Sequence, residues 1–346
     1  MNAPTGRLAD SLVLPQPYLL FLGDTVEASY AKTAFGLADW APDRCVGEMA
    51  IGGCTVTTGL ARLSPADARA AGARSVVIGV ANQGGVLADS WVAALIDAME
   101  AGLDVISGLH VRLASVPALA EAARRTGQRL IDVRTPPVGI PIGNGRKRSG
   151  KRLLTVGTDC ALGKKYTALA LHRAFVQRGI DADFRATGQT GIMIAGGGIP
   201  MDAVISDFEA GAAEILSPDA PDAHWDVVEG QGSIFNPAYA AVSLGLLHGS
   251  QPDVFVVCHD PARTVILGME SFAMPSVDEV IDLTIRLGSR TNPAIRCGGV
   301  SLNTSAYSAE EAEALMTAES ERLGLPVADP IRGGAAFDAL VDSCLA

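Results

Sequence analysis

A glycine-rich stretch from Leu153 to Phe175, LLTVGTDCALGKKYTALALHRAF, begins like a phosphate-binding loop. An apolar run leads into Gly157, a turn follows, and an amphipathic helix is expected to start at Gly163. In that order the backbone N–H groups and the positive helix end point at a bound anion, and Lys164 adds a charge. The alternative is a plain glycine turn with an exposed lysine. We expect a phosphate site with these contacts: Gly157, Thr158, Asp159, Cys160, Ala161, Gly163, Lys164, Lys165, Tyr166 and Thr167.

One residue departs from the usual pattern of such loops. A Ser or Thr normally follows the Gly-Lys pair because its hydroxyl binds magnesium, but Lys165 stands there. A second ammonium group repels a divalent cation and attracts an anion. Thr167, further along the helix, is expected to face the wrong way to replace the hydroxyl. We therefore expect no metal, and a loop that holds a diphosphate without cleaving it, as suits coenzyme A.

A second motif, WDVVEGQGS, ends a later apolar run and places Glu229 at the carboxyl end of a predicted strand. Parallel α/β sheets keep their chemistry at that end. The stretch GTDCALGKK, with five residues between Gly157 and Gly163 in place of four, resembles the phosphate loop of dethiobiotin synthetase and its relatives. The Glu-Gly pair resembles the second motif of that group. Together the two motifs indicate a P-loop domain.

The elements that position these motifs alternate along the chain. Short buried strands separated by helices imply a mostly parallel sheet with helices on both faces. The predicted strands are 17–23, 75–81, 103–108, 152–157, 182–187, 225–230, 252–259 and 297–303. The predicted helices are 90–102, 116–127, 163–179, 201–216, 237–249, 277–288 and 309–324.

A proline- and glycine-rich segment at 134–150 interrupts this alternation and indicates a linker between domains. We predict an α/β protein with a Rossmann-like domain at 1–135, a linker at 136–150 and a P-loop NTPase-like domain at 151–346. The basic run Arg146 to Arg148, with Lys151 and Arg152 behind it, is expected to be a solvated part of the linker. The alternative is that it helps to hold a phosphate.

Composition excludes several classes of protein. The 346 residues are 48% hydrophobic and 5% aromatic, which suits close packing of helices on a sheet and does not suit disorder. The net charge of −11 argues against a nucleic-acid partner, because phosphate contacts need clustered Lys and Arg. Six cysteines without zinc-site spacing, and no convincing signal peptide or membrane span, favour a cytoplasmic protein. A chain of this kind often forms homo-oligomers, and we expect one here.

Over nearly the whole chain, the motifs resemble one family of P-loop proteins, formerly of unknown function, that includes the DgcN-type D-glutamate N-acetyltransferases. The matching stretches are VGEMAIGGCTVTTGLARLSP, GVANQGGVL, GTDCALGKKYTALAL, FRATGQTGIMIAGGGIPMDAVISDFEAGAAE, WDVVEGQGSIFNPAYAAVSLGLLHGSQPD, GVSLNT and GLPVADPIRGG. The resemblance implies acetyl transfer from acetyl-CoA to the amine of D-glutamate, with the diphosphate of the cosubstrate in the glycine-rich loop.

Amide formation from a thioester needs a base for the amine proton and donors for the oxyanion. Glu229 is the first candidate for the base, with His259 or Asp260 second. A turn carboxylate and a structural histidine are the alternatives. Backbone N–H groups of Gly230 to Ser233 are candidates for the oxyanion donors.

The two carboxylates of glutamate call for cations and small polar donors. Arg185 and Arg263 follow predicted strands, and each could equally form a surface ion pair. The predicted substrate contacts are Arg185, Thr187, Gln189, Thr190, Gln231 and Arg263.

Three further features stay open at this stage. Cys160 lies in the loop, where a helix N-terminus is expected to lower its pKa, but direct transfer is favoured over a covalent acyl-cysteine. Glycine-rich loops at 50–59 and 81–87 are expected to close over the site from the N-terminal domain. The competing functions are an ATP-dependent ligase or kinase of the dethiobiotin synthetase type and a non-catalytic nucleotide- or CoA-binding protein.

Overall fold

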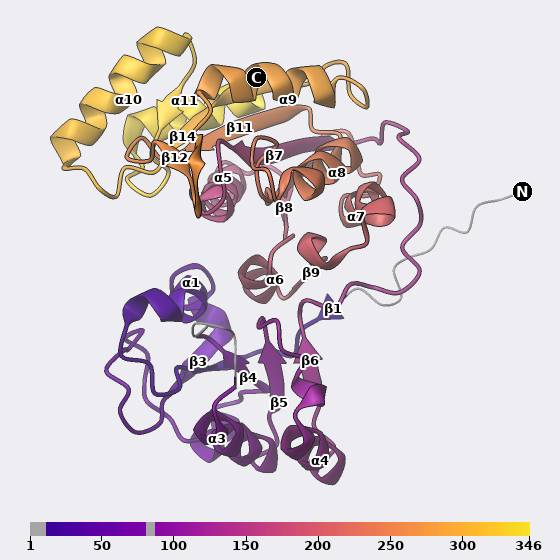
Figure 1. Ribbon diagram of the computed structural model, residues 1–346, viewed down its shortest axis with the longest axis vertical. Helices are drawn as coiled ribbons and strands as arrows, with labels where there is room; N and C mark the ends of the chain where they lie inside the picture. Colours follow the sequence, from indigo (N-terminus) through magenta and orange to yellow (C-terminus); the bar gives the residue numbers. More distant parts are fainter. Residues whose placement is uncertain (1–11, 81–86) are drawn as a thin grey trace, which may run out of the picture. The chain divides into compact units, whose positions relative to one another are not determined.

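The computed structural model describes residues 12–80 and 87–346, which form two compact α/β units (Figure 1). The described part of the N-terminal unit comprises residues 12–80 and 87–137 together with Gln189–Pro200. The C-terminal unit comprises Val138–Gly188 and Met201–Ala346. The main sheet of each unit is parallel, so the predicted α/β class is confirmed. No helix in the described part of the chain is both long and apolar enough to cross a membrane.

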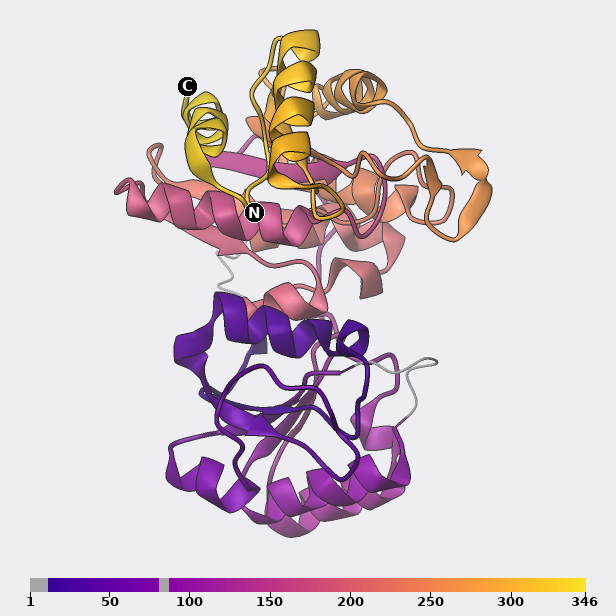
Figure 2. The same cartoon turned by 90° about the vertical axis from the view of Figure 1, so that its left-hand side faces the viewer.

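The N-terminal unit is built on a five-stranded sheet with the order β3-β2-β4-β5-β6. Helices α3 and α4 lie side by side on one face, and α1 packs on α6 at the other (Figure 2). Because both faces are covered, every residue of β2, β4 and β5 is buried. The strands are β2 Tyr18–Phe21, β3 Cys45–Met49, β4 Ser75–Ile78, β5 Asp104–Ser107 and β6 Leu130–Asp132. The helices are α1 Lys32–Trp40, α2 Pro65–Ala70, α3 Asp89–Glu100, α4 Pro117–Thr126 and α6 Gln189–Ala195, and a short ladder pairs β1 Leu12–Val13 with β9 Gly197–Gly198.

The C-terminal unit has a six-stranded parallel sheet with the order β15-β14-β11-β7-β10-β8. Helices α5 and α11 pack on one face, and α8 and α9 on the other (Figure 1). The strands are β7 Lys151–Gly157, β8 Ala182–Arg185, β10 Trp225–Val228, β11 Val254–His259, β14 Arg296–Leu302 and β15 Val327–Ala328. The helices are α5 Lys164–Gln177, α7 Glu209–Leu216, α8 Ala240–Ser250, α9 Val277–Gly288, α10 Ala309–Leu323 and α11 Gly334–Leu345. A separate hairpin pairs β12 Val265–Ile266 with β13 Met269–Ala273.

Strand β7 lies at the point where this sheet reverses its winding. It pairs with β10 on one side and with β11 on the other, both in parallel. The loops after β7, β10 and β11 therefore leave the same edge of the sheet. The loops after β10 and β11 lie on either side of the loop after β7. Such a switch point is where open α/β sheets bind ligands, and here it gathers the segments that follow Gly157, Val228 and His259.

The predicted elements are mostly present, with instructive exceptions. The expected helix at 201–216 is two short 3₁₀ turns, Met201–Ala203 and Ser206–Phe208, followed by α7. We did not predict α1, α2, α6, α11, the hairpin or the strands β1, β3, β6, β9 and β15. Most of these are short or lack a clear period, so tertiary contacts decide them. Helices α9 and α10 begin at capping boxes, at Ser276 and Ser308, which the sequence carries as Ser-x-x-Glu.

The expectation of a solvated basic linker is wrong for Arg148 and Arg152, whose side chains are buried. Arg148 donates to the carbonyl oxygens of Ser217 and Gly249, both at 2.7 Å. Arg152 donates to the carbonyl oxygen of Pro218 at 2.8 Å. These carbonyls belong to the C-terminal ends of α7 and α8, where helix dipoles attract cations. Arg152 is near the start of β7 and Gly157 at its end, so neither arginine serves the phosphate loop.

We predict that Arg148→Ala lowers the free energy of unfolding by about 3 kcal/mol or more, because it leaves buried carbonyl groups without their charged donor. Urea denaturation followed by circular dichroism measures this. Arg146→Ala is the matched control, since Arg146 lies on the surface and pairs with Asp219, and it is expected to change stability by less than about 0.5 kcal/mol. Equal effects of the two substitutions would contradict the helix-end role.

Candidate functional site

The glycine-rich loop turns its N–H groups toward one side. Arg263 donates to the carbonyl oxygens of Cys160 at 3.0 Å and of Ala161 at 2.6 Å. The C=O and N–H groups of a trans peptide point in opposite directions, so the N–H groups of residues 161 and 162 face away from Arg263. None of the N–H groups of residues 160–163 has an acceptor in the described part of the chain. Gly163, with φ 109°, then opens α5. A row of free donors at a helix N-terminus binds phosphate.

Lys164 is the first residue of α5 and directly follows these donors. Its side chain is buried, and Nζ donates to the carbonyl oxygen of Asp159 at 2.7 Å. Burial lowers the pKa of the Lys164 ammonium group. A Cβ atom at Gly230 would lie 3.1 Å from Lys164 Cδ and 1.6 Å from the carbonyl oxygen of Thr155. The Glu-Gly motif thus has a steric reason, since any side chain at residue 230 would collide with β7 and the lysine.

Asp159 holds the loop from within. Its buried carboxylate accepts from Asn236 Nδ2 at 2.9 Å and from the N–H of Leu267 at 2.7 Å, and it pairs with Arg263 at 3.2 Å. Leu267 lies in the turn of the β12–β13 hairpin. We predicted Asp159 and Arg263 as ligand contacts, whereas their side chains bind the loop itself. We missed Asn236, although its Asn-Pro pair marks a turn in the sequence.

Glu229 follows β10 at the same edge of the sheet as the loop. Its carboxylate is buried, and Oε2 accepts the N–H groups of Thr187 at 2.9 Å and Gly188 at 3.0 Å. Oε1 has no donor among the described residues, which leaves it available to a substrate. Burial raises the pKa of Glu229, and the hydrogen bonds and the ammonium groups of Lys165 and Lys164 oppose that rise. A carboxylate in such surroundings is suited to take a proton.

Small residues make room beside Glu229. A Cβ atom at Gly188 would lie 3.2 Å from Glu229 Oε1 and 2.9 Å from Gln231 Nε2. Gln231 Nε2 donates to Thr187 Oγ1 at 2.9 Å. Of the candidate oxyanion donors, the N–H of Gly230 is already used, because it donates to Thr155 Oγ1 at 2.9 Å. The N–H groups of residues 231–233 have no acceptor within the described chain and stay candidates.

The second-choice bases have different surroundings. His259 Nδ1 lies 3.0 Å from Thr158 Oγ1, and burial lowers the pKa of the imidazole. His259 also lines a separate pocket with Glu319 and Arg322, and no residue of 157–167 lines that pocket. Asp260 accepts the N–H of Ala262 at 3.0 Å in its own turn. Glu229 stays the first candidate for the base, and His259 and Asp260 stay the alternatives.

Other loop residues bear on covalent and metal chemistry. Burial raises the pKa of the Cys160 thiol, so the expected lowering by the helix terminus is wrong. A protonated thiol is a poor nucleophile. Thr167 Oγ1 is buried and lies 2.8 Å from Ser301 Oγ, so this hydroxyl is engaged inside the protein. Lys165 Nζ lies 4.3 Å from the centre of the Tyr166 ring. At the position where related loops hold magnesium, this chain presents a cation.

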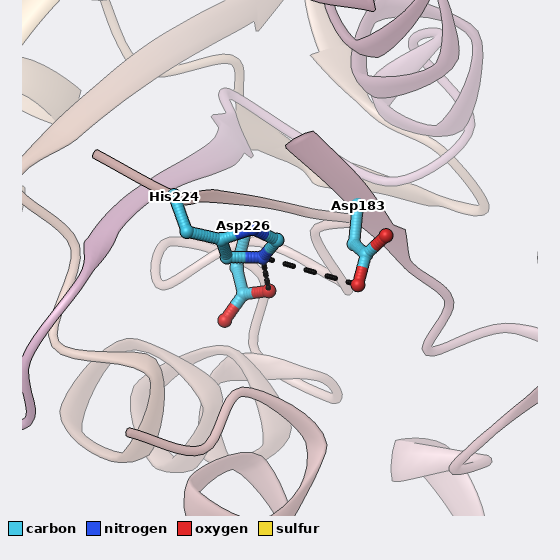
Figure 3. A group of neighbouring side chains, drawn as sticks. All are labelled: Asp183, His224 and Asp226. Atoms are coloured by element: carbon cyan, nitrogen blue, oxygen red, sulfur yellow. Dashed lines mark hydrogen bonds and ion pairs between the residues drawn. The ribbon is translucent and has the colours of Figure 1, made fainter. Parts of the chain in front are cut away.

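Arg185 pairs with two carboxylates of a cluster in which Asp226 is buried and Asp183 is exposed. It lies 2.6 Å from Asp226 and 3.0 Å from Asp183. Figure 3 shows His224 Nε2 pointing at the same two carboxylates, at 3.3 Å and 3.8 Å. These three residues are close enough to share a metal ion, but the guanidinium already supplies their positive charge. The main chain of Arg185 lies beside Glu229, whose N–H donates to the carbonyl oxygen of Arg185 at 3.0 Å. The guanidinium of Arg185 is bound to Asp226, three residues before Glu229 in the chain.

The predicted substrate run Thr187 to Gly191 is divided between the two units. Thr187 and Gly188 contact Glu229 in the C-terminal unit. Gln189 and Thr190 begin α6 in the N-terminal unit, where Thr190 Oγ1 lies 3.0 Å from Thr33 Oγ1. A strand-to-helix crossing between units left no clear signal in the sequence.

Of the two glycine-rich loops predicted in the N-terminal unit, at 50–59 and 81–87, the structure describes only the first in full. Residues 81–86 of the loop at 81–87 lie outside the described residues. In the loop at 50–59, the buried carboxylate of Glu48 binds Thr57 Oγ1 at 2.7 Å and the N–H of Thr58 at 2.6 Å. That these loops close over the site stays a prediction.

Comparison with known proteins identifies relatives over the whole chain. Residues 46–136 match the Rossmann-like domain of unknown function DUF1611_N, and residues 141–341 match the P-loop domain DUF1611_C. A protein from Tritonibacter scottomollicae named D-glutamate N-acetyltransferase is 48% identical over 96% of this chain and 100% of its own length. A protein of the same name from a Pseudoalteromonas species is 48% identical over 92% of this chain and 96% of its own length.

A solved structure supports the fold as well. The crystal structure of a DUF1611 family protein from Anabaena variabilis superposes with a TM-score of 0.82 at 31% identity, over 95% of this chain and 99% of that one. The predicted Rossmann-like and P-loop architecture and the predicted family are thereby confirmed. The chain belongs to the DUF1611 family, in which a Rossmann-like domain precedes a P-loop domain and whose members include proteins named D-glutamate N-acetyltransferase.

Proposed function

We propose that this protein is an acyltransferase that moves the acetyl group of acetyl-CoA to the amine of D-glutamate. The 48% identity to two proteins of that name, over nearly the full length of both chains, carries the proposal. The phosphate loop supports it independently. It offers free N–H groups and the ammonium groups of Lys164 and Lys165, which suit the diphosphate of coenzyme A without a metal ion. A cytoplasmic homo-oligomer remains part of the proposal.

In the proposed reaction the amine nitrogen attacks the thioester carbonyl carbon. A C–N bond forms, the C–S bond breaks, and coenzyme A leaves as the thiolate. Glu229 Oε1 accepts the proton that the amine loses and passes it toward the leaving sulfur. The N–H groups of residues 231–233 stabilise the oxyanion of the intermediate. Arg185 and Arg263 remain proposed carboxylate contacts, at the cost of the ion pairs that they form in the free protein.

Mass spectrometry of reactions with D- and L-glutamate tests the activity directly. We expect N-acetyl-D-glutamate and free coenzyme A in equal amounts. Calorimetry with acetyl-CoA and with magnesium ATP separates this activity from a ligase or kinase. Tight binding of the nucleotide without binding of acetyl-CoA would reverse the assignment, and binding of acetyl-CoA without any acetylated product would leave a non-catalytic binding protein.

Glu229→Gln is expected to lower kcat by about 10²- to 10⁴-fold, the range typical of losing a general base. In the unaltered protein kcat/KM should rise with pH through the pKa of Glu229, which burial has raised, because only the carboxylate accepts the proton. That limb of the pH profile should vanish in the variant. The melting temperature at pH 8 should not fall, because an ionised group whose folded pKa is raised destabilises the fold above that pKa.

Glu209→Gln is the matched control. Glu209 is another buried carboxylate of the same unit whose pKa burial raises, and we expect near-normal turnover. If Glu229→Gln changed only the affinity for acetyl-CoA, the carboxylate would not be the base.

Lys164→Ala is expected to weaken acetyl-CoA binding by about 10- to 100-fold, because a charge-assisted hydrogen bond is worth about 1.5–3 kcal/mol. Calorimetry measures the Kd. In the unaltered protein the Kd should rise at alkaline pH as Lys164, whose pKa burial lowers, loses its proton. An unchanged Kd in the variant would mean that the diphosphate binds elsewhere.

Lys165→Thr restores the hydroxyl that other P-loops use for magnesium. We expect weaker acetyl-CoA binding and a gain in magnesium-dependent nucleotide binding. If this variant bound acetyl-CoA as tightly as the unaltered protein, the second ammonium would play no part in the choice of ligand.

A further inference from the structure

An open pocket of about 380 Å³ lies beside the phosphate loop. Its walls come from three segments of the C-terminal unit, residues 161–167, 301–305 and 329–332. The first segment is the end of the loop and the first turn of α5. The other two segments overlap the motifs GVSLNT, at 299–304, and GLPVADPIRGG, at 324–334. The size falls within the range of small-molecule sites, about 300–1,000 Å³.

The pocket is mainly apolar, with a few fixed polar groups. Tyr166, Leu302 and Ile331 supply apolar surface, and Ile331 is 66% exposed, which is high for a large aliphatic side chain. Asn303 Oδ1 accepts the N–H of Ser305 at 3.2 Å. That bond orients the carboxamide, and its Nδ2 donor has no partner among the described residues. Apolar walls with one oriented amide donor suit a flat heteroaromatic ring.

The walls are tied to each other. Asp329 accepts the hydroxyl of Thr304 at 2.5 Å and the N–H of Ile331 at 2.9 Å. Arg332 donates to Thr304 Oγ1 at 2.7 Å and to the carbonyl oxygen of Tyr307 at 2.7 Å. These bonds join the second and third segments into one frame, so the pocket keeps its shape without a ligand. Preformed walls of this kind favour binding because little order is lost.

We propose that this pocket binds the adenosine end of coenzyme A, with the adenine ring on the apolar wall and Asn303 Nδ2 donating to a ring nitrogen. The inference rests on the proposed function. The diphosphate joins adenosine to the pantetheine arm, and the loop residues that would bind it also line the pocket. Glu229 does not line the pocket. Asp329 does, but its carboxylate accepts the hydroxyl of Thr304 and is not the proposed base. The thioester must reach the base, so the pantetheine arm leaves on the other side and adenosine occupies the pocket.

Two acetyl donors with the same thioester test the assignment. Acetyl-CoA carries adenosine 3′,5′-bisphosphate on its 4′-phosphopantetheine arm, and S-acetyl-4′-phosphopantetheine lacks that whole group. We expect the unaltered protein to use both, with a KM for the truncated donor at least about tenfold higher, because remote contacts supply binding energy. Equal KM values would overturn the proposal and leave the acetyltransferase activity standing.

A pocket-filling variant sharpens the test. Ser305 is exposed at the rim of the pocket, and Ser305→Trp should raise the KM for acetyl-CoA about tenfold while leaving that for the truncated donor unchanged. Ala306→Trp is the matched control, because residue 306 is exposed beside the rim and does not line the pocket. Asn303→Asp keeps the oxygen that accepts from Ser305 and removes the donor, so it should also weaken acetyl-CoA selectively. An equal effect of Ser305→Trp on both donors would contradict the proposal.

Direct binding distinguishes failure of the pocket from failure of the reaction. Calorimetry with adenosine 3′,5′-bisphosphate should show binding that Ser305→Trp weakens about tenfold, with ADP as the comparison for a general adenine nucleotide site. If D-glutamate were not acetylated but this binding held, the proposed function would fail and the adenosine pocket would stand. If the bisphosphate did not bind, the pocket assignment would be wrong whatever the enzyme does.

Discussion

The anion site that we propose depends on the conformation of one loop. Arg263 donates hydrogen bonds to two carbonyl oxygens of the loop, and Lys164 donates to a third. The N–H groups of the same three peptides have no acceptor in the described part of the protein. An unpaired N–H group is costly where water is excluded, so a loop of this kind is stable only if water or an anion satisfies it. The buried carboxylate of Asp159 makes the arrangement possible because it balances Arg263 and fastens the loop to the segments at Asn236 and Leu267. The charged side chains of Asp159, Lys164 and Arg263 thus hold the loop, and its unpaired backbone N–H groups are the proposed ligand donors.

Beside this anion site the protein keeps a carboxylate that burial makes reluctant to ionise. Glu229 is held by two N–H groups on one oxygen, and two ammonium groups nearby favour its charged form. Burial raises the pKa of Glu229, and the hydrogen bonds and ammonium groups oppose that rise, which are the surroundings expected of the proposed base. Gly188 and Gly230 leave the space that this arrangement needs, because a side chain at either position would come too close to Glu229, Gln231 or Lys164. The glycine-rich loop and Glu229 leave the same edge of the sheet because β7 and β10 pair in parallel.

The opposite edge of the sheet carries the structural charges. Arg148 and Arg152 are buried near the start of β7 and bind the carbonyl ends of α7 and α8. Arg185 ends β8 at the carboxyl edge, but its side chain pairs with Asp226 and Asp183. In a parallel α/β sheet the helix C-termini gather at this edge and attract cations, while the helix N-termini gather at the other and attract anions. The same dipole argument thus explains why Arg148 and Arg152 stabilise one edge of the sheet, while the glycine-rich loop at the other edge is the proposed anion site.

The sequence by itself determined the class of the protein, the P-loop domain and the order of most strands and helices in the C-terminal unit, and it singled out Glu229 as the proposed base. These features depend on local patterns: the period of apolar residues, a glycine-lysine turn after a strand and the absence of the magnesium-binding hydroxyl. Only the tertiary structure decided which polar residues face a ligand and which face the protein. Arg263, Arg185 and Asp159 have the residue types of a binding site, yet each is engaged by partners between 41 and 108 positions away in the chain. The pocket between residues 161–167, 301–305 and 329–332 has the same origin. No spacing in the sequence predicts it, because those segments meet only when the parallel strands bring their carboxyl ends to one edge.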